Sequence, residues 1–162
     1  MFASRHAIAK ATMPIIAGMV SAFFVISEAT AAEKITVCSA KGAGASQGAG
    51  KGFLQLSRLL ALPAEDIDAG NDTIALTQDE QGFDLILNWH QQDEHSLRAG
   101  GVDILGTALG NLIHVMVAGG QDRIEHYLFN LDEDGSGDLL WDAGASQRQN
   151  DSSASFACTK PR

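Results

Sequence analysis

The residues of this chain best suited to binding a cation lie in the acidic stretch from Asp132 to Asp138. The stretch reads DEDGSGD and places side-chain oxygens on Asp132, Asp134, Ser136 and Asp138, with Glu133, Gly135 and Gly137 between them. Calcium prefers clustered hard oxygens on a loop that bends sharply. The stretch therefore predicts a calcium site formed by these four residues.

The spacing resembles the first half of an EF-hand calcium loop, with Asp132, Asp134 and Ser136 at the first, third and fifth ligand positions. The glutamate that closes such a loop would stand at position 143, where this chain has Ala143. An acidic, glycine-containing turn between two strands explains the same residues without a metal. Both interpretations stay open on the sequence alone.

A second pattern lies in the glycine-rich segment, where residues 44–48 read GASQG. This matches the G-x-S-x-G elbow, in which a strand and a following helix present a serine as a nucleophile. Ser46 would be that nucleophile in a small serine hydrolase. However, only one strand is expected before it, the chain is short for that hydrolase fold, and glycine- and alanine-rich loops produce the pattern by chance.

The histidines form no pattern that is diagnostic of zinc. His90, Glu94 and His95 lie close together in the sequence, but a zinc site needs three or four convergent ligands. We expect His114 and His126 on the polar faces of their strands. These residues are interpreted as surface histidines.

Four aromatic residues offer a different kind of site. Trp89, Tyr127, Phe129 and Trp141 could line a barrel interior that holds a small apolar ligand. Small barrels also fill their interiors with such side chains, so these residues equally predict a plain core.

The first 31 residues have the features of a cleavable signal peptide. Arg5 and Lys10 precede an uncharged run from 11 to 26, and Ala29-Thr30-Ala31 provides a small-x-small cleavage site. The run is shorter than the roughly 20 apolar residues of a membrane-spanning helix. We expect residues 32–162 to form one exported domain, periplasmic or secreted, with no stable membrane anchor after cleavage.

The chain has only two cysteines, Cys38 and Cys158. Cysteines of exported proteins usually pair, because the compartment is oxidising. In the chain-entropy model, a disulfide that closes a loop of about 120 residues stabilises a fold by about 5 kcal/mol. The sequence therefore predicts a Cys38–Cys158 disulfide.

The net charge of the chain limits the classes of partner that we expect. Removal of Arg5, Lys10 and Glu28 with the signal changes the formal charge from −9 to −10. An acidic surface repels phosphate backbones and anionic lipids, so nucleic-acid binding is not expected. An unknown protein or a small apolar ligand remains as the expected partner, with no cofactor beyond the calcium considered above.

Short alternating runs separated by turn residues fill the chain from residue 73 onward, as in 83–89 and 112–118. They predict a mainly all-β fold, an antiparallel meander of about eight short strands in a small barrel or sandwich. One short helix is expected near 53–61, a glycine-rich loop at 42–52 and a polar loop at 143–155. In a closed meander the first and last strands are neighbours, which would place the disulfide across the closing seam.

These observations favour a non-enzymatic exported binding or interaction module. The alternatives are a serine hydrolase using Ser46 and a calcium-dependent module using the 132–138 turn.

Overall fold

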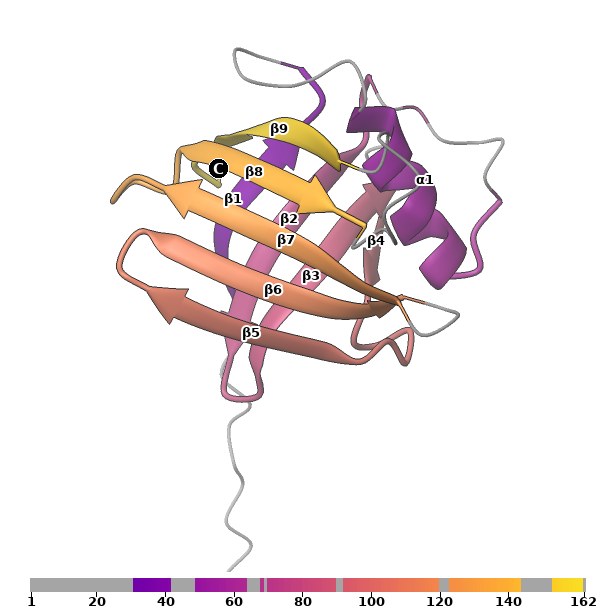
Figure 1. The fold of residues 1–162 in the computed structure, drawn as a ribbon, viewed down its shortest axis with the longest axis horizontal. Coiled ribbons are helices and arrows are strands. Elements are labelled where there is room, and N and C mark those ends of the chain that lie inside the picture. Colours follow the sequence, from indigo (N-terminus) through magenta and orange to yellow (C-terminus); the bar gives the residue numbers. More distant parts are fainter. Residues whose placement is uncertain are drawn as a thin grey trace, which may run out of the picture.

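The computed structural model describes residues 31–41, 49–63, 68, 70–89, 92–119, 123–143 and 153–161 (Figure 1). They form one helix and nine strands: β1 Glu33–Ser39, α1 Ala49–Leu59, β2 Thr73–Asp79, β3 Gly82–Trp89, β4 Asp93–Ser96, β5 Ile104–Leu109, β6 Leu112–Gly119, β7 Arg123–Leu131, β8 Gly137–Asp142 and β9 Ser153–Thr159.

All nine strands belong to one antiparallel sheet that curls into a half-barrel, which confirms the predicted fold class. Their order is β4-β3-β2-β1-β9-β8-β7-β6-β5. The sheet thus consists of two meanders, β1–β4 and β5–β9, that meet where β1 pairs with β9. Its free edges, β4 and β5, follow each other in the chain. The curl brings β5 against β3, and a Cβ on Gly106 would stand 2.5 Å from the Phe83 ring.

The disulfide between Cys38 and Cys158 is present, as predicted, and the two cysteines are direct partners in the β1–β9 register. Both side chains are buried in the core. The first and last strands are neighbours, as expected, but their contact lies in the middle of the sheet order rather than at a closed seam. The bond therefore joins the two meanders, and the sheet remains open between β4 and β5.

The hairpins follow the sequence pattern closely. Gly110 and Asn111 form the two-residue turn between β5 and β6, and Gly110 has a φ of 58°, which glycine adopts without strain. In β6 the side chains of Ile113, Val115 and Val117 point into the core. This is the alternation of a strand with one buried face.

The helix begins earlier than predicted. Ala49–Gly52, assigned from sequence to the glycine-rich loop, are the first residues of α1. Gly52 is buried against β9, where a Cβ would stand 2.7 Å from Cζ of Phe156. A glycine that looks like a helix breaker in sequence thus serves close packing of the helix on the sheet. The rest of the predicted loop, residues 42–48, lies outside the described residues.

Two other boundaries also differ from expectation. The predicted polar loop at 143–155 overlaps β9, which begins at Ser153. Strand β4 was not predicted, because its sequence DEHS has no apolar alternation. Pairing with β3 holds it, and the buried Asp84 accepts hydrogen bonds from the Ser96 hydroxyl and, at 3.2 Å, from the Arg98 amide.

The four aromatic residues considered as a ligand site are core residues. Trp89, Tyr127, Phe129 and Trp141 are each at most 5% exposed and belong to one continuous core cluster. Helix α1 packs on β9 and β3 at one end of the half-barrel (Figure 1). No helix in the described part of the chain has the length and apolar character needed to cross a bilayer.

Candidate ligand-binding site

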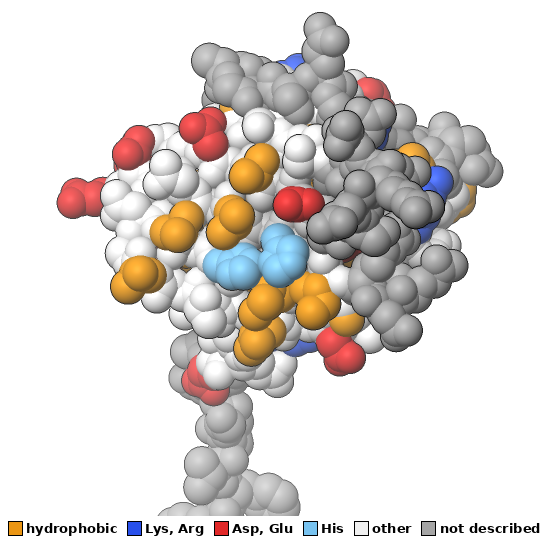
Figure 2. Space-filling view, viewed as in Figure 1, with side chains coloured by type: hydrophobic (Ala, Val, Ile, Leu, Met, Phe, Trp, Pro, Cys, Tyr) orange, Lys and Arg blue, Asp and Glu red, His pale blue; other side chains and the backbone are white. Residues whose placement is uncertain are grey.

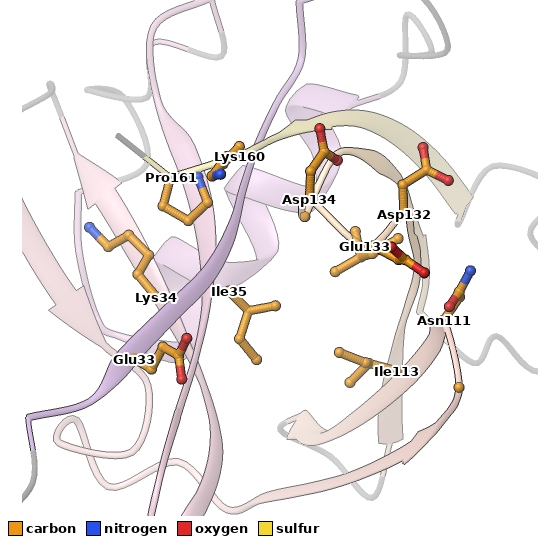
Figure 3. Close-up of a pocket in the computed structure, with 13 residues that line it drawn as sticks. Glu33, Lys34, Ile35, Asn111, Ile113, Asp132, Glu133, Asp134, Lys160 and Pro161 are labelled. Carbon is orange, nitrogen blue, oxygen red and sulfur yellow. The ribbon is translucent and has the colours of Figure 1, made fainter.

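A hollow of about 490 Å³ is shown in Figure 3. The β5–β6 and β7–β8 turns beside it lie at the end of the half-barrel opposite α1 (Figure 1). The hollow lies between β1, the β5–β6 hairpin, the β7–β8 turn and the residues after β9. Its lining consists of Glu33, Lys34, Ile35, Gly110, Asn111, Ile113, Leu131, Asp132, Glu133, Asp134, Gly135, Lys160 and Pro161. This volume is within the range of small-molecule sites in proteins, about 300 to 1,000 Å³.

The floor of the hollow is apolar. Ile35 of β1 and Ile113 of β6 extend into the space from opposite sides (Figure 3). β1 and β6 are not paired with each other, because β9, β8 and β7 separate them in the sheet. Leu131 and Pro161 complete the apolar surface. The curl of the sheet thus leaves room between two strands that both point apolar side chains inward.

The β7–β8 turn forms one wall and is tied to β1. Within the turn, the Asp132 amide donates to the Ser136 carbonyl at 2.7 Å, and the Gly135 amide to the Asp132 carbonyl at 2.9 Å. The Thr36 hydroxyl, buried in β1, donates to the Gly135 carbonyl at 2.6 Å. Gly135 has a φ of 83°, and a Cβ there would stand 2.5 Å from the Ile35 carbonyl oxygen. This wall is therefore held in place by packing that only glycine permits.

Charge is distributed unequally around the rim. Lys34 and Lys160 lie on the side of β1 and the chain after β9, whereas Asp132 and Glu133 lie toward the β5–β6 hairpin (Figure 3). Lys34 is paired with Glu94 outside the hollow, at 3.0 Å.

Two hydrogen bonds from Ser136 to Asp134, from its hydroxyl and its backbone amide, lower the pKa of the Asp134 carboxyl, and nearby Lys160 adds to the effect. Asp134 and its neighbours Asp132 and Glu133 give the rim an excess of negative charge. This wall is therefore suited to attract a cation.

The residues of the predicted calcium site are only partly brought together. The Ser136 hydroxyl lies 2.6 Å from Asp134 Oδ1 and 3.4 Å from Asp132 Oδ2, so these three side chains gather as the sequence suggested. Asp138 lies on β8 with an exposed side chain that alternates away from buried Leu139. Within the described ranges, no three His, Cys, Asp or Glu side chains are placed to hold a metal. Calcium binding stays a prediction.

The other sequence candidates divide between described and undescribed regions. Ser46 and His90 lie outside the described residues. His95 of β4 packs edge-on against Trp89, with ring centroids 6.0 Å apart. His114 and His126 lie on neighbouring strands, and Nε2 of the first is 2.9 Å from Nδ1 of the second.

One polar group of the core was overlooked in the sequence. Glu125 is 1% exposed, and its Oε2 accepts hydrogen bonds from the Tyr127 hydroxyl at 3.0 Å and from Trp141 Nε1 at 3.1 Å. Among the residues that the structure describes, its Oε1 has no hydrogen-bond partner. Burial, followed by the Glu125 charge, raises the pKa of Tyr127 well above its usual value. The sequence could have revealed this burial, because the strand alternation of residues 125, 127 and 129 places Glu125 on the apolar face of β7.

Comparison with families of known proteins, with curated proteins and with solved structures finds no match for this chain.

Proposed function

We propose that this protein is a non-enzymatic, exported binding module that holds a small ligand with an apolar body and a positive charge in the hollow beside the β7–β8 turn. The observation that carries the proposal is the combination, in one hollow, of an apolar floor at Ile35 and Ile113 with an acidic wall at Asp132 and Glu133. Ligand sites commonly join apolar walls to a few convergent polar groups.

The charge of the ligand follows from the balance of the rim. Lys34 is paired with Glu94, and Lys160 lies close enough to Asp134 for its charge to lower the pKa of that carboxyl. Glu33, Asp132 and Glu133 are the acidic side chains left to face a ligand. The chain as a whole carries a formal charge of −9, which also favours the approach of cations.

Export is supported by two features. The buried Cys38–Cys158 disulfide is compatible with an oxidising location. Residues 1–31 have the composition of a cleavable signal, which would release residues 32–162 to the periplasm or the exterior. N-terminal sequencing of the exported protein tests this part, with Ala32 as the expected first residue.

Ligand binding is tested with two probes of similar shape and opposite charge, phenethylamine and 3-phenylpropionate. In NMR titrations of residues 32–162, the amine is expected to shift the amide signals of Ile35, Ile113 and Gly135, and the acid is not. Equal shifts from both probes, or none from either, would contradict the proposal. Glu133→Gln should weaken amine binding several-fold, whereas Asp93→Asn, on β4 and outside the hollow, should not.

A calcium-dependent module is the second candidate, favoured by the convergence of Asp132, Asp134 and Ser136 in the turn. Extracellular calcium modules bind with dissociation constants as weak as about 10⁻⁴ to 10⁻³ M. Millimolar calcium, compared with magnesium, should then raise the melting temperature, and Asp134→Asn should abolish the increase. An unchanged melting temperature would remove this candidate and leave the ligand proposal intact.

A further inference from the structure

A second surface lies away from the hollow, on the outer face of β5–β8. Every large hydrophobic residue found exposed in the described part of the chain lies on these four strands: Leu105, Leu109, Leu112, Ile124 and Leu140. Leu109 is 82% exposed and Leu105 is 61% exposed. Scattered surface leucines are ordinary in soluble proteins, but their concentration on one face marks an interaction site.

The strand register makes this face continuous. Leu105 is the partner of Met116 and Leu109 of Leu112 across β5 and β6, and Leu128 is the partner of Leu140 across β7 and β8. Directly opposite side chains on one face of a sheet lie about 5 Å apart and touch. Aliphatic side chains therefore recur on this face across all four strands.

Two histidines occupy the middle of the face. Figure 2 shows histidine side chains together on this face, with hydrophobic side chains and an acidic one next to them. Nε2 of His114 and Nδ1 of His126 are 2.9 Å apart, and the rings are within 22° of parallel with centroids 5.2 Å apart. One ring donates an N–H to the other, so the pair satisfies part of its own hydrogen-bonding need. The centre of the face can then be covered at low cost in desolvation.

A shallow groove of about 340 Å³ crosses one side of this face. It is lined by Asp103, Ile104, Leu105, Met116, Val117, Ala118 and Ile124. Asp103 is its one charged residue, and it lies just before β5. The groove can take a bulky aliphatic or aromatic side chain from a partner.

Exposed acidic side chains lie around the face, with Asp103 and Asp138 at its edges. Arg123, the first residue of β7, is the one lysine or arginine in the sequence of these four strands. The other described lysines and arginines lie outside these strands, namely Lys34, Lys41, Lys51, Arg58, Arg98 and Lys160. An apolar face with an acidic rim is complementary to an apolar segment that carries positive charges.

We propose that the outer face of β5–β8 binds a segment of a partner protein whose aliphatic or aromatic side chains are flanked by lysines or arginines. A second copy of this chain fits less well, because it would bring the same acidic rims together. The small area of the face also argues against a second copy of the chain. Four strands about 4.8 Å apart and about 20 Å long present roughly 300 to 400 Å², below the ~800 Å² per partner of a standard stable interface.

The test uses two synthetic amphipathic peptides with one leucine pattern, flanked by lysines in one and by glutamates in the other. Binding to residues 32–162 is measured by NMR. The lysine peptide is expected to shift the amide signals of β5–β8 and to bind at least tenfold more tightly than the glutamate peptide. Its affinity should fall as salt is raised, because exposed charges are screened.

Exposed residues can be changed without disturbing the core. Leu105→Ser and Leu140→Ser should each weaken the lysine peptide about tenfold, and Asp138→Asn should weaken it a few-fold. Asp93→Asn, which removes the same charge from β4, is the matched control and should have no effect. Gln78→Ser, on β2, serves as the control for serine substitution.

Three results would overturn the proposal. Equal binding of both peptides would remove the charge argument. Shifts confined to the hollow at Ile35 and Ile113 would place the peptide elsewhere. Dimerisation of the free chain that is lost in Leu105→Ser would assign the face to a second copy. Phenethylamine binding is measured on its own, at the hollow, so this proposal and the ligand proposal can fail separately.

Discussion

Gly52 of α1 lies so close to Phe156 of β9 that a Cβ on the glycine would stand 2.7 Å from the ring. Phe156 is fully buried and packs edge-on against Phe53, with ring centroids 5.3 Å apart. The ring therefore has little freedom to move away. The position of the helix on the sheet depends on the absence of a side chain at residue 52.

The first prediction concerns this contact. In an exposed helix, Gly→Ala stabilises by about 1 kcal/mol, whereas overpacking a core costs typically 1 to 3 kcal/mol. Because residue 52 is buried, Gly52→Ala is expected to lower the free energy of unfolding by about 1 kcal/mol. Urea denaturation measures it, with the exposed Arg58→Ala as a helix control. A Gly52→Ala protein as stable as the unmodified chain would show that the ring can yield.

The second prediction concerns the disulfide, whose cysteines are 120 residues apart in sequence. In the chain-entropy model a closed loop of this length stabilises the fold by about 5 kcal/mol. Reduction, or the double substitution of Cys38 and Cys158 by alanine, should lower the urea midpoint accordingly. The oxidised protein, denatured without reductant, should show no thiol that reacts with an alkylating agent. Two reactive thiols would contradict the bond.

The third prediction concerns the ion pair between Asp79 and Arg98, which links the end of β2 to the connection after β4. Arg98 Nη1 lies 2.9 Å from both Asp79 carboxylate oxygens, and Nη2 donates to the Gly82 and Phe83 carbonyls. The hydrogen bond from Arg98 is the largest effect on Asp79 and lowers its pKa from 3.8.

A depressed pKa in the folded state gives stability that is present above the unfolded value and lost as the pH falls through the folded value. Asp79→Asn should therefore reduce stability at neutral pH and flatten its decline below about pH 4. Unfolding by urea at several pH values tests this. Asp93→Asn is the control, and an equal flattening in that variant would contradict the assignment.

The fourth prediction uses the fact that Tyr127 is the sole tyrosine of the chain. Burial, then the charge of Glu125, raises its pKa well above 10.0. A raised folded pKa means that this contribution to stability is complete below pH 10 and is lost as the pH rises further. Tyrosinate absorbance should therefore appear together with unfolding, well above pH 10.

Glu125→Gln is the informative variant for Tyr127. It removes the negative charge but keeps a side chain of the same size, so tyrosinate should form at a lower pH than in the unmodified chain. Burial would still hold the pKa above 10.0. A gradual titration centred on pH 10 in the folded, unmodified protein would contradict the buried arrangement of Tyr127 and Glu125.

Local features account for what the sequence predicted well. The β5–β6 hairpin depends on the Gly110-Asn111 turn and on alternation in the strands beside it, all within a short span. The disulfide was inferred from compartment and cysteine number. Where only local signals were needed, the elements of the structure match the expectation.

Long-range contacts account for what was missed. The start of α1 depends on Phe156, about 100 residues later in the chain, and β4 depends on Asp84 of β3. The acidic turn was recognised, but the hollow beside it needs Ile35 and Pro161, which only the β1–β9 pairing brings near. No pattern within one segment reveals a space formed by four segments.

The pairing of β1 with β9 in the middle of the sheet also affects the order in which parts of the chain can fold. Each meander can form from neighbours in sequence, but one edge of β1 must wait for a strand about 120 residues later. During synthesis or export from the N-terminal side, β1 and β2 emerge long before β9. That unpaired edge is exposed to other chains until β9 arrives. The interval before the two meanders join is thus when this protein is most vulnerable to aggregation.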